Sequence, residues 1–145
     1  MCPRVLVSIV TYNSEPYLKA CIESLRAQTC SDYAVVLWDN ASTDNTPAVI
    51  EHYRPHLHFV HLSQSNAGFC AAHNRLIDSA ASDYVLVLNP DVILDARFIE
   101  ILIREMDLDP GAGSATGKLL RQPETASPAR RSSDKKILDT TGIYM

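Results

Sequence analysis

Short apolar segments rich in β-branched residues recur along the first ninety residues of the chain. Their composition predicts strands, because Val and Ile favour extended backbone. Three of them, "VLVSIV", "AVVLW" and "YVLVL", are almost continuously hydrophobic, which is typical of parallel strands that are buried on both faces. The predicted strands are Val5–Thr11, Tyr33–Asp39, Leu57–Leu62 and Tyr84–Leu88.

The segments between these strands show helical periodicity, with apolar residues three and four positions apart. A Ser14-Glu15-Pro16 start signal precedes the clearest helix, and Asp95 can cap another that Asp109-Pro110-Gly111 stops. A shorter helix is predicted over Pro47–Tyr53. The three apolar stripes are Leu18, Cys21, Ile22 and Leu25; Phe69, Ala72, Leu76 and Ala80; and Ile99, Leu102, Ile103 and Met106. Alternating strands and helices predict an α/β fold, a mostly parallel sheet with helices on both faces.

Length and composition narrow the class further. The chain has 145 residues, 46% hydrophobic and 21% charged, with a net charge of -4. These values are typical of one globular domain and give no reason to expect a nucleic-acid partner. No apolar run reaches the roughly 18 residues of a membrane span, and four cysteines without a paired spacing favour reduced thiols. We therefore predict a cytoplasmic location.

Residues 121–136 contain no large apolar side chain, and we predict a mobile loop there. Residues 118–136 hold six basic and two acidic side chains. This charge could attract a phosphate-bearing lipid acceptor or the inner face of an anionic membrane, so peripheral membrane association stays open. Simple solvation explains it as well. The "KILDTTGIYM" end of the chain is predicted to begin one more strand.

A polar cluster follows each predicted strand. In parallel sheets ligands bind beyond the carboxyl ends of the strands, so these clusters are the candidate site. Asn, Asp, Ser and Gly also form turns and helix caps, and Ser14 and Asp44 could do no more than cap the helices after them. The clusters are Thr11-Tyr12-Asn13-Ser14, Asp39-Asn40-Ala41-Ser42-Thr43-Asp44, Ser65-Asn66-Ala67-Gly68 and Asn89-Pro90-Asp91.

Two of the clusters suggest nucleotide chemistry. Asp39 ends a buried strand, where a carboxylate is costly unless a donor meets it. The N3–H of uracil or thymine is such a donor, and Tyr12 could stack on that base. Gly68 precedes a helix whose free N–H groups could face phosphate oxygens, and Arg75 or His73 could add charge there.

The last cluster suggests a metal. Proline keeps Asn89 out of the helical region, so we expect the extended path to continue and to present Asn89 and Asp91 at the sheet edge. Mg²⁺ is often held by one or two carboxylates together with substrate phosphates. Asp91 is a candidate carboxylate ligand, and Asn89 could add an amide oxygen.

The clusters, in this order, resemble the nucleotide-sugar-binding part of family 2 glycosyltransferases with the GT-A fold, most closely the rhamnosyltransferase-like branch. The likeness covers about residues 4–106. It is carried by "VSIVTYNSEPYLKACIESL", "VVLWDNASTDNT", "SNAGFCAAHNRLI" and "YVLVLNPDVIL".

The resemblance implies an inverting transfer of a sugar, rhamnose favoured, from a dTDP- or UDP-sugar to a glycan or lipid-linked acceptor, in polysaccharide synthesis. It places three groups of residues: Thr11, Tyr12 and Asn13 around the nucleotide, Asp39 and Asn40 at the base, and Asn66 and Gly68 near the diphosphate. Asn89-Pro90-Asp91 then occupies the place of an Asp-x-Asp motif that binds Mg²⁺ or Mn²⁺, with Asn in place of the first acid.

The same resemblance implies a general base further along than Met145. We therefore expect residues 1–145 to be a single but incomplete GT-A domain, truncated at its C-terminus, and leave the catalytic residue unassigned. The alternative is a nucleotide-binding module or inactive fragment. A GT-A-like nucleotidyltransferase is disfavoured because the first strand has no glycine-rich, lysine-bearing loop. The histidines His52, His56, His58 and His61 could suggest zinc, but their spacing favours surface and strand positions.

Overall fold

The computed structural model describes residues 2–120 and 138–140 of the chain. It divides into two compact units, Met1–Ile103 and Arg104–Met145. The predicted mobile loop, residues 121–136, lies outside the described residues. All the candidate site residues belong to the first unit.

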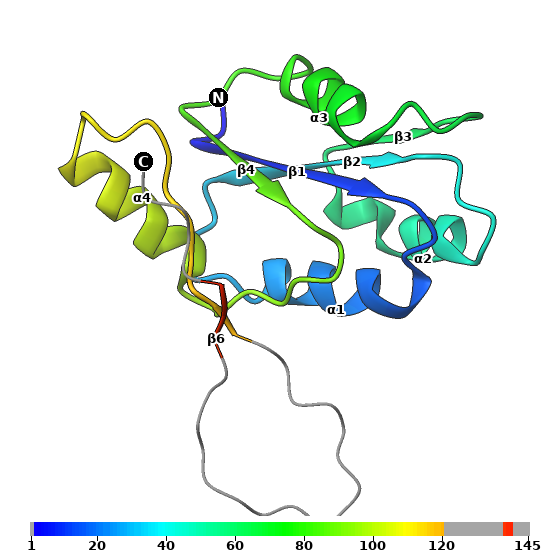
Figure 1. Cartoon of the computed structure of the whole chain (residues 1–145), viewed down its shortest axis with the longest axis horizontal. Coiled ribbons are helices and arrows are strands. Elements are labelled where there is room, and N and C mark those ends of the chain that lie inside the picture. Colours follow the sequence, from blue (N-terminus) through cyan, green and yellow to red (C-terminus); the bar gives the residue numbers. More distant parts are fainter. Residues whose placement is uncertain (1, 121–137, 141–145) are drawn as a thin grey trace, which may run out of the picture. The chain divides into compact units, whose positions relative to one another are not determined.

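The first unit is built on a four-stranded sheet of order β3-β2-β1-β4 (Figure 1). Every neighbouring pair in this sheet is parallel. The strands are β1 (Val5–Thr11), β2 (Tyr33–Asp39), β3 (Phe59–Leu62) and β4 (Tyr84–Leu88). Parallel neighbours need crossover connections, and a helix lies between each pair of successive strands of this sheet. The predicted α/β class with a mostly parallel sheet is confirmed.

Helices cover both faces of the sheet, as Figure 1 shows. On one face lie α1 (Glu15–Arg26) and α2 (Thr46–Tyr53), and the short 3-10 helix η1 (Arg54–His56) continues α2. On the other face lies α3 (Phe69–Ile77). Pro16 and Pro47 stand in the first turns of α1 and α2, where a missing N–H costs nothing.

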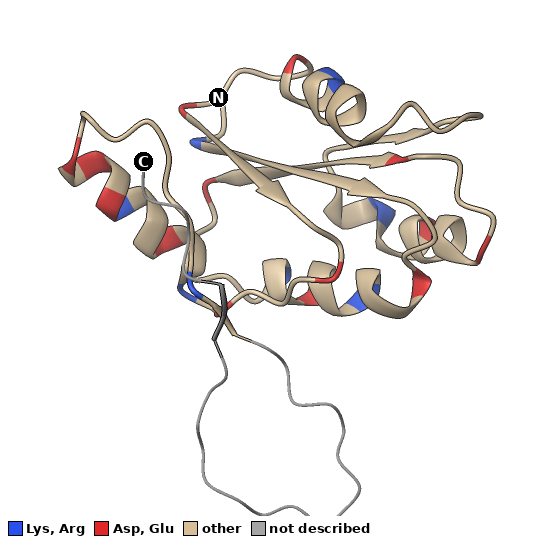
Figure 2. Cartoon of the chain, in the orientation of Figure 1, with Lys and Arg blue, Asp and Glu red and all other residues tan. Residues whose placement is uncertain are grey.

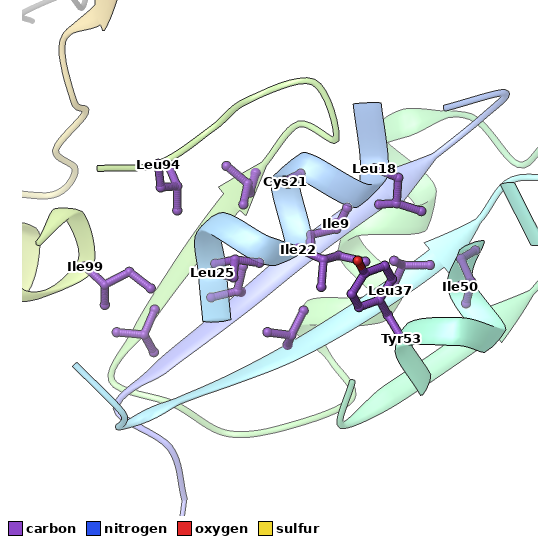
Figure 3. Packing of buried hydrophobic residues seen from close by; sticks show 14 residues of the cluster. Ile9, Leu18, Cys21, Ile22, Leu25, Leu37, Ile50, Tyr53, Leu94 and Ile99 are labelled. Carbon is purple, nitrogen blue, oxygen red and sulfur yellow. The ribbon is translucent and has the colours of Figure 1, made fainter. Parts of the chain in front are cut away.

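The two faces of the sheet bury two separate apolar clusters. The larger one packs α1 and α2 against the sheet, with Leu18, Ile22 and Leu25 of α1 over Ile9 and Leu37 (Figure 3). The smaller one packs Ala72 and Leu76 of α3 against residues of β1 and β2. The predicted stripe of α1 is therefore confirmed in full. The α3 stripe is confirmed only at Ala72 and Leu76, since Phe69 is exposed and Ala80 lies beyond the helix end.

The prediction that β4 is buried on both faces was wrong. Strand β4 forms one edge of the described sheet, and its burial alternates. Val85 and Val87 are 41% and 50% exposed, while Leu86 packs against the larger cluster. Val85 is paired with Leu6, on the face that α3 covers, but α3 packs over β1 and β2. One face of β4 therefore stays open in the first unit.

Helix α4 (Phe98–Leu108) begins in the first unit and ends in the second. It stops just before Asp109-Pro110-Gly111, as predicted, and Ile99 is its one fully buried apolar residue. The second unit also holds an antiparallel pair of β5 (Leu119–Leu120) and β6 (Leu138–Thr140). The strand predicted at the end of the chain is thus present over residues 138–140. No helix in the described part of the chain is long and apolar enough to cross a membrane.

Candidate functional site at the carboxyl edge of the sheet

The parallel register places the ends of the strands at one edge of the sheet (Figure 1). Thr11 pairs with Asp39, and Asp39 pairs with Leu62 on the following strand. On the other side of β1, Ile9 pairs with Leu88, the last residue of β4. The four polar clusters of the sequence therefore start from the same edge. Acidic residues, red in Figure 2, occur in the loops that follow β2 and β4.

Asp39 is the most buried acid of this edge, with an exposure of 2%. Its Oδ1 atom accepts hydrogen bonds from the hydroxyls of Thr11 (2.9 Å) and Ser42 (2.5 Å). Its Oδ2 atom accepts one from the backbone N–H of Ser42 (3.1 Å). A carboxylate can accept about four hydrogen bonds, so three donors offset most of the cost of burial and leave one acceptor position on Oδ2.

The loops after β1 and β2 interlock through Asn13. Its backbone N–H donates to the Ser42 hydroxyl (2.9 Å), and its Oδ1 atom accepts from the backbone N–H of Thr43 (2.8 Å). Asn13 has a φ of 50° and Ala41 a φ of 64°, both in the left-handed region. Asn tolerates that region, whereas Ala stores strain there, and such strain persists only where surrounding contacts hold it.

Asp44 joins the starts of two helices. Its Oδ1 atom accepts from the backbone N–H of Thr46 at the start of α2 (3.0 Å), and its Oδ2 atom accepts from that of Glu15 at the start of α1 (3.2 Å). Burial alone would raise the pKa of Asp44, but the hydrogen bonds from Thr46 and Glu15 outweigh it and lower the pKa. Ser14 stands at the N-cap position of α1, but the alternative that its side chain caps the helix does not hold, because that side chain bonds to Tyr12 and makes no cap bond.

Asn40 links three loops from a buried position. Its backbone N–H donates to the carbonyl of Thr11 (2.8 Å). Its Oδ1 atom accepts from the indole N–H of Trp38 (3.3 Å) and from the backbone N–H of Ala67 (2.9 Å). Through these bonds the buried side chain ties the Asn66-Gly68 turn to the end of β2.

Asn66 and Gly68 form the turn that leads into α3. The Oδ1 atom of Asn66 accepts from the backbone N–H of Gly68 (2.8 Å). Gly68 has a φ of 84°, and a Cβ atom placed there would meet nothing within 4 Å. Glycine is therefore needed at this position for its backbone conformation and not for space. Both residues are exposed beside the end of β2.

The three remaining candidate residues, Tyr12, Arg75 and His73, have different environments. Tyr12 is 54% exposed at the edge, where its ring is free to stack on a ligand. Arg75 lies on α3 with its guanidinium carbon 5.3 Å from the centre of the Trp38 ring. His73 points into the sheet, because its Nδ1 atom lies 2.8 Å from the hydroxyl of Ser8. Burial lowers the pKa of His73, which disfavours the positive charge considered for it.

Asn89, Pro90 and Asp91 turn the chain directly after β4. The backbone N–H of Val92 donates to the carbonyl of Asn89 (3.3 Å), which makes residues 89–92 a β-turn with proline in its second position. The expected continuation of the extended path was therefore wrong: proline fixes φ for a turn here. The outcome at the side chains is as expected, since Asn89 and Asp91 are both exposed.

One buried thiol lies beneath this turn. Cys21 of α1 donates a weak hydrogen bond from Sγ to the carbonyl of Asn89 (3.7 Å). Burial, with a smaller contribution from the negative charge of Asp91, raises the pKa of Cys21 to about 12. The four cysteines are free thiols, as predicted. The sequence indicated Ser42 only as one member of a polar cluster and Cys21 only as part of an apolar helix stripe, so neither contact could be predicted from it.

The residues at the turn fit a metal shared with a ligand. Among residues 2–120 and 138–140, no three His, Cys, Asp or Glu side chains are grouped to hold an ion by themselves. Asp91 offers one exposed carboxylate and Asn89 one exposed amide. This set suits Mg²⁺ or Mn²⁺ only when phosphate oxygens complete the coordination. The histidines have other contacts: His61 stacks on Trp38, and His58 accepts from the N–H of Val35.

Comparison with known proteins settles the family. The family model described as "Glycosyl transferase family 2" matches residues 6–141. The chain belongs to glycosyl transferase family 2. The curated relatives of this family 2 chain include an N-acetylglucosaminyl-diphospho-decaprenol L-rhamnosyltransferase of Mycobacterium tuberculosis, 34% identical over 81% of the chain and 41% of that protein. A chondroitin synthase of Escherichia coli is 32% identical over 74% of the chain and 16% of that protein.

Solved structures share the fold of the family 2 chain. The mannosyltransferase PcManGT from Pyrobaculum calidifontis, in complex with GDP-Man and Mn²⁺, matches with a TM-score of 0.69 and 26% identity, over 78% of this chain and 34% of that one. Staphylococcus aureus TarS 1-349 in complex with UDP-GlcNAc matches with a TM-score of 0.66 and 25% identity, over 78% and 37%. These matches confirm the GT-A-like architecture. The chain spans about a third of the length of several curated relatives, and 41% at most among those compared.

Proposed function

We propose that this chain binds the donor of a glycosyltransferase that uses a nucleoside-diphospho-sugar. The observation that carries the proposal is that four polar loops start from one edge of a parallel sheet, with a buried carboxylate, Asp39, and an exposed one, Asp91. The solved relatives bind UDP, UDP-GlcNAc and GDP-Man, which supports a nucleotide-sugar as the ligand class.

The base end of the pocket is proposed at β1 and β2. The free acceptor position on Oδ2 of Asp39 suits an N–H donor such as the N3–H of uracil or thymine. Because Thr11 and Ser42 hold the carboxylate in place, it needs no rearrangement to accept that bond. The exposed ring of Tyr12 can stack on the same base. Asn13 and Asn40 support this end by holding the loops together.

The diphosphate end is proposed between the Asn66-Gly68 turn and the Asn89-Pro90-Asp91 turn. Asp91 and Asn89 would hold Mg²⁺ or Mn²⁺ together with phosphate oxygens, and the bound ion would neutralise charge that develops on the leaving diphosphate. The backbone N–H groups at the start of α3, which follows the positive-φ residue Gly68, would donate to the phosphate oxygens. The Mn²⁺ complex of a structural relative supports a divalent cation.

The finer assignment is a rhamnosyl donor, dTDP-linked, transferred with inversion to a glycan or lipid-linked acceptor in cell-envelope polysaccharide synthesis. The rhamnosyltransferase relative, with 34% identity, supports it. Relatives whose names specify other sugars, including chondroitin synthase and a mannosyltransferase, make UDP- and GDP-sugars the alternatives to test. We place the reaction in the cytoplasm, at the inner face of the membrane where a lipid-linked acceptor would be met.

The test is calorimetric titration of this chain with dTDP-rhamnose, UDP-GlcNAc, GDP-mannose and ATP, each with Mn²⁺ and with EDTA. We expect one pyrimidine or guanine nucleotide-sugar to bind with metal and ATP not to bind. In Asp91→Ala the affinity gained by adding Mn²⁺ should vanish, because no carboxylate remains at the turn. The affinity in EDTA should stay that of the wild type.

Asp78→Asn is the matched control, since Asp78 is an exposed acid at the opposite end of α3. It should bind nucleotide as the wild type does, with metal and without. Equal loss of binding in Asp78→Asn and Asp91→Ala would point to a general effect of charge. Tight binding of ATP with no pyrimidine or guanine nucleotide bound would sink the proposed function.

A further inference from the structure

The segment between β4 and α4, residues 89–97, carries the two proposed metal ligands without regular secondary structure of its own. An irregular segment keeps a fixed shape only where other groups satisfy its backbone. Several backbone groups of this segment form hydrogen bonds with side chains of α1 and of the residues just after it. The contacting side chains are Cys21 and Ser24, three residues apart on one side of α1, and Gln28, two residues beyond the end of that helix.

Ser24 holds the middle of the segment. Its hydroxyl accepts from the backbone N–H of Leu94 (3.1 Å) and donates to the carbonyl of Cys21 (2.7 Å). Both Ser24 and Leu94 are 8% exposed, so water does not compete freely for these bonds. Loss of this hydroxyl would leave the N–H of Leu94 buried and unpaired, which is costly.

Gln28 clamps the far end of the segment. Its Nε2 atom donates to the carbonyls of Asp95 (2.7 Å) and Ser24 (3.1 Å). Its Oε1 atom accepts from the backbone N–H of Ile99 (3.0 Å), one residue into α4. One side chain therefore joins α1, the irregular segment and the start of α4. The backbone of Thr29 adds a neighbouring bond to the carbonyl of Ala96 (2.8 Å).

Cys21 meets the near end, at the metal turn itself. The carbonyl of Asn89 accepts both from Val92, which closes the turn, and from the Cys21 thiol. Cys21 is fully buried, and its sulfur lies 3.7 Å from the Asn89 carbonyl oxygen. The three side chains therefore contact the segment at its near end, its middle and its far end.

We propose that Cys21 and Ser24 of α1, together with Gln28 just beyond its end, form a row of positioning residues that sets where Asp91 stands at the sheet edge. The inference rests on the proposed function, since it assumes that Asp91 binds a metal together with a diphosphate. In this proposal, the C-terminal half of α1 and the residues just after it hold the metal turn in place, and none of the three side chains is itself a proposed ligand of the metal.

The experiment compares Gln28→Ala and Ser24→Ala with the wild type in nucleotide titrations, with Mn²⁺ and with EDTA. Removing a group that orients a metal ligand costs about 10- to 100-fold in metal affinity. We expect the affinity gained by adding Mn²⁺ to fall about tenfold, while the affinity in EDTA stays that of the wild type. Cys21→Ser, which keeps a donor under Asn89, should lose less of the gain than Cys21→Ala.

Tyr53→Phe is the matched control. It removes a bond between α1 and α2, from the Tyr53 hydroxyl to Glu23 (2.7 Å), and leaves the 89–99 segment untouched. It should lower thermal stability and keep the full gain from Mn²⁺. If Gln28→Ala and Ser24→Ala behave like Tyr53→Phe, these residues are merely structural and the inference is overturned.

Two further outcomes separate this inference from the proposed function. If Mn²⁺ does not increase the affinity of the wild-type chain for nucleotide, both the proposed function and this inference are wrong. If Mn²⁺ increases the affinity of the wild type, and Asp91→Ala abolishes this increase while Gln28→Ala keeps it, only the inference is wrong. If a variant fails to fold, hydrogen exchange on the wild type tests the inference instead. The amides of Leu94 and Ile99 should exchange slowly, and that of exposed Ile93 should exchange fast. Equally fast exchange at all three amides would contradict the proposed row of positioning residues.

Discussion

The conservative substitution Asp39→Asn tests the base end of the pocket most directly. The amide oxygen of Asn can replace Oδ1 and keep the hydroxyl bonds from Thr11 and Ser42. The amide NH2 then replaces Oδ2 and faces the backbone N–H of Ser42, so that two donors meet. Hydrogen bonds to a charged group contribute about 1.5–3 kcal/mol, so we expect unfolding by urea to require about 2 kcal/mol less free energy.

The same change removes the proposed acceptor of the base N–H. A charge-assisted bond of about 2 kcal/mol corresponds to about 30-fold in Kd, and the loss should be equal with Mn²⁺ and with EDTA. Calorimetry on folded Asp39→Asn, beside Asp78→Asn as the surface control, measures it. Wild-type affinity in Asp39→Asn would show that Asp39 only holds the loops after β1 and β2. An unchanged free energy of unfolding would contradict the hydrogen-bond assignment itself.

Three further predictions concern the rest of the chain. Cys21, whose pKa is raised to about 12, should resist alkylation at pH 8 in the folded chain, while exposed Cys2 and Cys70 react; mass spectrometry of labelled peptides distinguishes them. Because burial lowers the pKa of His73, the unfolded chain takes up its proton first as pH falls below about 6.5. The free energy of unfolding should therefore decline below that pH, more steeply than in His73→Gln, as urea titrations at several pH values would show. Ala41→Gly relieves a φ of 64° and should stabilise the chain by up to about 1 kcal/mol; a destabilised variant would contradict the strain assigned there.

Much of the fold could be predicted from local patterns. The bounds of β1, β2 and β4 agree with the predicted segments, because β-branched runs between turn residues encode strands directly. Strand β3 begins at Phe59 and not at Leu57, where the chain is still leaving η1. The polar clusters after the strands identified the edge that could bind a ligand, since parallel strands end on the same side.

The site residues themselves could be predicted as a set, but not in their individual environments. Nothing in the order of residues indicates that Asp39 already accepts three hydrogen bonds or that Asn40 is buried between three loops. Asn66 and Gly68 look like phosphate ligands and also build their own turn. A polar side chain can serve a ligand or the protein, and only its neighbours in space decide how many of its bonds remain free.

The sequence by itself determined the alternation of strands and helices, the edge that carries the polar loops, and the family resemblance. Tertiary structure alone decided that β4 lies at one edge of the described sheet, because hydrophobicity records how well a strand can be buried and not which neighbour it receives. It also decided how the turn at Asp91 is held. Ser24 and Leu94 stand 70 residues apart, and such a contact has no local signal because it forms only when α1 packs beside the segment after β4.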